Sequence, residues 1–150
     1  MVEFKVVIND TKQGKSHQVQ VEGHHANSLI GKKIGDEVDG IFISLPGYKL
    51  QITGGTDKDG FMMRKDLGGT VRRNLLLSKS KGCNPNEKGK RVKKTVRGNT
   101  INQDVVQINM KVIKYSSRKI SDLIKTEDKK EEKEEENKED KKWVFLNNQK

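Results

Sequence analysis

The charge of this chain is concentrated in one stretch, and that stretch limits what can fold. Residues 61–100 contain 12 Lys and Arg against 2 Asp and Glu, whereas residues 1–60 contain 7 against 8. Hydrophobic residues make up only 31% of the sequence and charged residues 35%, so the chain can bury only a small core. We expect one folded domain in 150 residues, with part of the chain gaining order against a partner.

Short alternating segments predict β-structure. Apolar and polar residues alternate on either side of a turn-rich segment at residues 9–14, which predicts an antiparallel hairpin over residues 2–22. Residues 23–40 are rich in Gly, Lys and Asp and have room for one helical turn. The predicted strands lie at residues 2–8, 17–21, 41–43, 48–52 and 105–115. We therefore expect an all-β fold, a small β-barrel of short antiparallel strands with long basic loops.

The composition changes after residue 115. Residues 116–150 contain 10 Lys and Arg against 10 Asp and Glu, with no apolar stripe, so they could form a solvated helix or remain disordered. The apolar cluster at residues 143–146 is either a frayed terminus or a short contact for a partner protein, with Trp143 as its anchor. We expect a domain at residues 1–115 and a mixed-charge tail at residues 116–150.

The basic segment predicts a polyanionic partner. Because the segment itself contains almost no acidic residues, we do not expect internal ion pairs to neutralise it, and its glycines would let the backbone follow a phosphate surface. Phe61 is its only aromatic residue, which favours contacts with phosphates and 2′-hydroxyls of folded RNA over base stacking. A basic run can also be only a solvated surface.

Other kinds of site lack the residues they need. Cys83 is the only cysteine, so the chain has no internal disulfide and falls short of a structural zinc site. Residues 57–60 resemble a calcium loop, but Gly68 stands where the twelfth-position glutamate is required, so we expect a turn. No catalytic set of acid, base and nucleophile can be assembled. We expect a cytoplasmic protein that is not an enzyme and has no cofactor, metal, membrane or small-molecule partner.

Three stretches resemble a known family. They are residues 45–61 (LPGYKLQITGGTDKDGF), 94–101 (KTVRGNTI) and 105–111 (VVQINMK). On these stretches the chain resembles the archaeal and eukaryotic small-subunit ribosomal protein number six, the e-type family. The resemblance implies a β-barrel bound to small-subunit ribosomal RNA beside neighbouring ribosomal proteins, acting in assembly and translation without catalysis. The tail lacks the long basic helix of eukaryotic members, which indicates the short archaeal form.

The charge pattern and the resemblance together give a set of expected RNA contacts. For Asn99, a role in stabilising its own turn is the stronger interpretation. Two alternatives remain open: a free-standing RNA-binding module or translation-associated factor, and an interaction adaptor that works through the tail. The residues expected to face ribosomal RNA are Arg64, Arg72, Arg73, Lys88, Lys90, Arg91, Lys93, Lys94, Arg97 and Asn99.

Overall fold

The computed structural model describes residues 2–116, 118–120 and 123–124. The chain divides into two compact units, Met1–Tyr115 and Ser116–Lys150. The strands, the seven-residue helix α1 and the short helix η1 all belong to the first unit. The predictions for residues 125–150, including the partner contact anchored by Trp143, lie outside the described residues.

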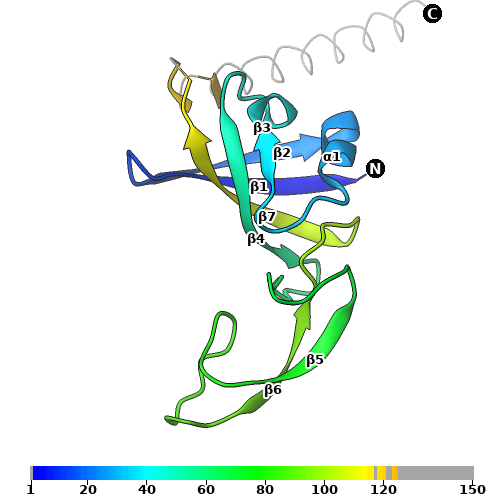
Figure 1. Ribbon diagram of the computed structural model, residues 1–150. Helices are drawn as coiled ribbons and strands as arrows, with labels where there is room; N and C mark the ends of the chain where they lie inside the picture. The colour runs from blue at the N-terminus through cyan, green and yellow to red at the C-terminus, as the bar shows by residue number, and fades with distance from the viewer. Residues whose placement is uncertain (1, 117, 121–122, 125–150) are drawn as a thin grey trace, which may run out of the picture. The chain divides into compact units, whose positions relative to one another are not determined.

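The first unit is built on a five-stranded mixed sheet with the order β2-β1-β7-β4-β3 (Figure 1). The strands β1 and β2 form the antiparallel hairpin predicted over residues 2–22, which is confirmed. β7 then lies beside β1 in parallel and beside β4 in antiparallel orientation. The strands are β1 (Glu3–Asp10), β2 (Lys15–Glu22), β3 (Glu37–Asp39), β4 (Lys49–Asp57) and β7 (Val105–Lys114).

The predicted all-β class is confirmed, but a barrel is not found. β2 and β3 stand at opposite edges of the sheet, and no ladder joins them within the described residues, so the sheet stays open. The parallel pairing of β1 with β7 also departs from the expected all-antiparallel arrangement. Alternation along a strand determines which side chains are buried, but it does not determine which strand lies next to it.

The core lies on one face of this sheet. Phe4, Val6 and Ile8 are fully buried on β1, and the residues between them are more exposed, as a period of two requires. Helix α1 (Gly23–Leu29) is the helical turn expected in this region, and it packs against β1 and β2. Its buried residues Ala26 and Leu29 add to the core. Full burial of each large apolar side chain contributes about 1.5–3 kcal/mol.

Residues 41–43 do not form the predicted strand. They belong to a 3-10 helix, η1 (Gly40–Ile43), which ends at Ser44 with a left-handed φ of 59°. The amide of Leu45 donates to the Gly40 carbonyl over 2.8 Å and closes the turn. A Cβ at Gly40 would lie 2.2 Å from the Leu45 carbonyl oxygen, so the turn requires glycine there. The run of β-branched and aromatic residues was too short to override this turn.

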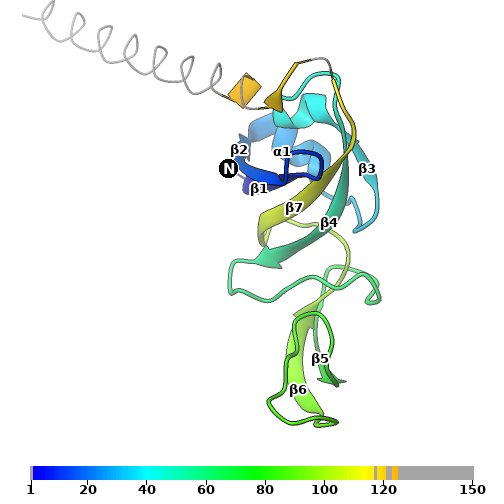
Figure 2. The same ribbon diagram turned by 90° about the vertical axis from the view of Figure 1, so that its left-hand side faces the viewer.

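The basic segment contains a two-stranded antiparallel ribbon that the sequence did not predict. It consists of β5 (Arg72–Leu77) and β6 (Val92–Arg97), joined by residues 78–91, and is separate from the main sheet (Figures 1 and 2). Residues 95–97 therefore lie in a strand, just before Gly98. Most β5 and β6 side chains are at least partly exposed, so these strands lack the clean alternation of buried and exposed residues that reveals a strand.

Candidate nucleic-acid interface

Residues 62–64 join the β5–β6 ribbon to the main sheet. The Met63 amide donates to the carbonyl of Gly55 in β4 over 2.9 Å. On the other side, the Arg97 amide donates to the Met62 carbonyl, and the Arg97 carbonyl accepts from the Arg64 amide, both over 3.0 Å. Met63 thus pairs with β4, and Met62 and Arg64 on either side of it pair with the end of β6.

A close contact between two loops supports the same end of the ribbon. The Asn99 amide donates to the Leu67 carbonyl over 2.7 Å, and the Thr100 amide donates to the Gly69 carbonyl over 3.1 Å. A Cβ at Gly98 would lie only 1.9 Å from the Gly69 oxygen. Gly98 therefore allows two parts of the chain to meet. The sequence had suggested that the glycines of the segment let the backbone follow a phosphate surface, but Gly98 serves this internal contact instead.

Arg97 is the main correction to the expected RNA contacts. Its side chain is 2% exposed and forms an ion pair with Asp57, whose side chain is fully buried at the end of β4. Its guanidinium also donates to the side chains of Asn102 and Asp104. Arg97 was expected to face RNA, but the structure contradicts this because the guanidinium is enclosed by acceptors from its own chain. It stabilises the junction between ribbon and sheet.

Arg72 bonds to the same carboxylate from β5. Its Nε donates to Asp57 over 2.6 Å, and its guanidinium pairs with Asp59 over 2.6 Å. Burial alone would raise the pKa of Asp57, but hydrogen bonds from Arg72 and Arg97 outweigh burial and hold that pKa below its ordinary value. One third of the Arg72 side chain remains exposed. The Arg72 guanidinium lies 5.0 Å from the centre of the Phe61 ring.

Internal ion pairs therefore neutralise part of the basic segment, contrary to expectation. Arg72 and Arg97 pair with aspartates that lie just outside residues 61–100 in the sequence. Within the segment, Lys90 pairs with Glu87 over 3.2 Å. The aspartates that form these pairs, Asp57, Asp59 and Asp104, lie within a few residues of the two ends of the segment. Acidic residues just beyond those ends were therefore the sequence signal that could have revealed the pairs.

Two further predicted residues hold loops in place. Arg64 pairs with Asp66 over 2.9 Å and donates to the Ser80 hydroxyl over 3.1 Å, which ties together two loops beside the ribbon. The Asn99 side-chain amide donates to the Lys65 carbonyl over 3.3 Å, so this bond joins two loops that are far apart in the sequence and does not lie within the turn of Asn99 itself.

The remaining cations of the segment stay available to a partner. All of them are exposed, and none forms an ion pair within the described residues. They lie on the ribbon, on the loop that joins its strands, and at residue 65. We call this set the ribbon cations: Lys65, Arg73, Lys79, Lys81, Lys88, Arg91, Lys93 and Lys94. Arg73, Lys88, Arg91, Lys93 and Lys94 are common to this set and to the expected RNA contacts.

Other kinds of site do not take shape in the described part of the chain. Residues 58–60 form the expected turn, closed by a hydrogen bond from the Gly60 amide to the Asp57 carbonyl over 2.9 Å. No three His, Cys, Asp or Glu side chains of the described residues gather as metal ligands. In that same part, no helix has the length and apolar character to cross a bilayer. Cys83 is buried, and it is a free thiol.

Fold and site together define a small mixed-sheet protein that presents a basic two-stranded ribbon. The profile of the ribosomal protein S6e family matches residues 4–125. This chain belongs to that family, so the resemblance found in the sequence is confirmed. The family consists of structural, non-enzymatic proteins, and on this ground the chain is not an enzyme.

Similar proteins named small ribosomal subunit protein eS6 occur in several archaea. The Archaeoglobus fulgidus protein is 51% identical over 128 residues, covering 85% of this chain and 99% of its own length. The Methanococcus maripaludis protein is 54% identical over 114 residues, covering 76% of this chain and 90% of its own length. The Methanocella arvoryzae protein is 47% identical over 130 residues, covering 87% of this chain and 92% of its own length. The chain therefore resembles the archaeal form of the family.

Proposed function

We propose that this chain is a structural constituent of the small ribosomal subunit and that its ribbon cations hold ribosomal RNA. The names of its archaeal relatives support the first part. The observation that carries the second part is the set of exposed cations without carboxylate partners on the β5–β6 ribbon and its loop.

The distribution of charge favours a partner that lies along the ribbon. Residues 1–60, which form most of the sheet, carry 7 Lys and Arg against 8 Asp and Glu, so the positive field comes from the ribbon side. Each phosphate that a ribbon cation neutralises releases condensed counterions, and this release drives binding at moderate salt. A narrow ribbon with few aromatic side chains suits the phosphates and 2′-hydroxyls of folded RNA.

The proposal also defines partners and location. The RNA partner is small-subunit ribosomal RNA, and neighbouring ribosomal proteins complete the surroundings. The chain then acts in subunit assembly and translation, in the ribosome of the archaeal cytoplasm. Arg97 and Arg72 contribute indirectly, because they fix the ribbon on the end of the sheet.

Sedimentation of a cell lysate on a sucrose gradient tests the proposal. The full-length protein should appear in the small-subunit fractions. A ribbon variant with Arg73, Lys88, Arg91 and Lys93 replaced by Ala should shift toward the top of the gradient. A sheet variant with Lys5, Lys49, Lys111 and Lys114 replaced by Ala is the matched control, since it removes four exposed cations elsewhere and should stay with the subunit.

Two results would overturn the proposal. Absence of the unchanged protein from small-subunit fractions, together with recovery on many unrelated RNAs, would favour a free-standing RNA-binding module. Equal sedimentation of the ribbon and sheet variants would show that the ribbon cations are not the contact.

A further inference from the structure

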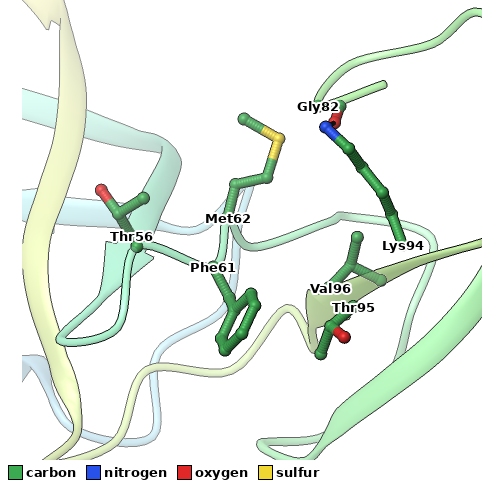
Figure 3. Close-up of a pocket in the computed structure, with 8 residues that line it drawn as sticks. Thr56, Phe61, Met62, Gly82, Lys94, Thr95 and Val96 are labelled. Atoms are coloured by element: carbon green, nitrogen blue, oxygen red, sulfur yellow. Dashed lines mark hydrogen bonds between the residues drawn. The ribbon is translucent and has the colours of Figure 1, made fainter. Parts of the chain in front are cut away.

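A pocket of about 310 Å³ opens where residues 61–62 separate from β6 (Figure 3). The side chains of Phe61 and Met62 stand on one side of this pocket, and those of Lys94 and Val96 stand on the other. Gly82, from the loop that joins β5 to β6, lies at its rim next to the end of Lys94. The pocket is therefore formed at the junction of sheet, ribbon and loop.

The walls of this pocket are apolar and include a flat ring. Phe61 is partly exposed, so its ring is accessible to a ligand in the pocket. Met62 is 36% exposed and adds a polarisable side chain, while Val96 is buried beneath. A planar aromatic ligand gains affinity by stacking on such a ring.

The open edge of β6 adds a donor and an acceptor. Arg97 directs its backbone amide and carbonyl toward residues 62–64, where both are bonded over 3.0 Å. Alternate residues of a strand direct these groups to the same edge, so the amide and carbonyl of Thr95 also face this side. At Thr95, residues 61–62 are too far from β6 to pair with it, and the space between them is the pocket. Neither Thr95 group has a partner outside the ribbon among the described residues.

Within the described residues, one unpaired cation stands at the rim of the pocket. The Lys94 ammonium lies at the rim, 3.0 Å from the Gly82 carbonyl. The Arg72 guanidinium lies 5.0 Å from the centre of the Phe61 ring, but Asp57 and Asp59 already neutralise it. A ligand that combines a flat ring, hydrogen-bonding edge groups and a negative backbone matches all three features. An apolar side chain from a protein would match only the walls.

We infer that this pocket binds a single unpaired nucleobase of the RNA held by the ribbon, an inference that rests on the proposed function. The base stacks against Phe61 and presents its edge to the backbone amide and carbonyl of Thr95. A flanking phosphate lies near Lys94. The site thus adds recognition of one extruded nucleotide to a surface that otherwise contacts phosphates.

Binding of two matched RNA hairpins to the full-length protein tests this inference. One hairpin is fully paired, and the other carries a single bulged nucleotide in the same stem, with each of the four bases in turn. The protein should bind at least one bulged hairpin about five-fold or more tightly than the paired hairpin, and both should share one salt dependence.

Phe61→Leu should remove the preference for the bulge and leave the salt dependence unchanged. Phe42→Leu in η1 is the matched control, because it makes the same chemical change at another partly exposed phenylalanine, and it should retain the preference. If Phe61→Leu does not fold, 2-aminopurine at the bulge supplies a second measurement on the unchanged protein. Its fluorescence should change on binding, because the base leaves the RNA stack.

The outcomes separate this inference from the proposed function. Equal binding of bulged and paired hairpins with a steep salt dependence overturns the pocket inference alone, and would favour a protein side chain as the occupant. A bulge preference that survives in folded Phe61→Leu, or 2-aminopurine fluorescence that does not change, also overturns it. Failure to bind any hairpin at low salt overturns the proposed function.

Discussion

Asp57 is the residue on which the junction between ribbon and sheet depends most. It lies at the end of β4 and accepts hydrogen bonds from Arg97 in β6 and Arg72 in β5. Taking a carboxylate and a guanidinium out of water is costly, and their mutual attraction offsets that cost only while both are present. The carboxylate therefore connects three strands, and each strand supplies one charged group to the cluster.

Asp57→Asn is expected to lower the free energy of unfolding by about 3–5 kcal/mol, because it removes the buried counter-charge of the Arg97 guanidinium and leaves only the half-exposed Asp104 carboxylate. Urea denaturation measures this loss. Asp59→Asn is the matched control, since the Asp59 side chain is 51% exposed, and its loss should stay below about 1 kcal/mol. Similar losses in the two variants would contradict the role assigned to Asp57.

The lowered pKa of Asp57 predicts a dependence of stability on pH. A carboxyl group whose pKa is lower in the folded state stabilises the fold above its unfolded value, ordinarily 3.8, and this contribution is lost as pH falls through the folded pKa. The melting temperature of the unchanged protein should therefore fall more steeply below about pH 4 than that of Asp57→Asn. Parallel curves would contradict the prediction. Asp10, whose pKa is also lowered, is present in both proteins and cancels in this comparison.

At the scale of elements, the ribbon is a separate structure attached at one end. Within the described part of the chain, β5 and β6 pair only with each other, apart from the contacts of residues 62–64 and the loop around Gly98. A two-stranded ribbon has little stability of its own in water. Its shape therefore depends on the backbone contacts at its base.

Gly98→Ala is expected to destabilise that base by about 1–3 kcal/mol, because the new Cβ would lie 1.9 Å from the Gly69 oxygen, which is backbone and cannot rotate away. Hydrogen exchange of the β5 and β6 amides should increase in this variant. Gly54→Ala in β4 is the control, since a Cβ there meets nothing within 4 Å. Unchanged exchange in Gly98→Ala would contradict the expected strain.

The sequence predicted elements whose burial alternates and missed those whose burial does not. The hairpin of β1 and β2 follows from apolar residues at every second position. The strands β5 and β6 and the three-residue β3 lacked such a signal, because both faces of the ribbon are partly exposed and β3 is short. The exposed cations were predictable from composition. The buried role of Arg97 was not, because it depends on Asp57, which lies 40 positions earlier in the chain.

At the scale of the whole molecule, the excess of positive over negative charge is concentrated in residues 61–100. Residues 116–150 carry 10 Lys and Arg against 10 Asp and Glu and so add no net charge. Removal of residues 116–150 should therefore leave the salt dependence of RNA binding unchanged, as filter binding at several salt concentrations would measure. A shallower salt dependence after truncation would contradict this prediction and assign phosphate contacts to the tail.

The most direct test of the account is the slope of log affinity for small-subunit ribosomal RNA against log salt concentration. We predict that the ribbon variant reduces the magnitude of this slope by an amount that corresponds to up to about four phosphate contacts. The sheet variant, which loses the same charge, should keep the slope of the unchanged protein. Identical slopes for the two variants would contradict the claim that the β5–β6 ribbon holds the RNA.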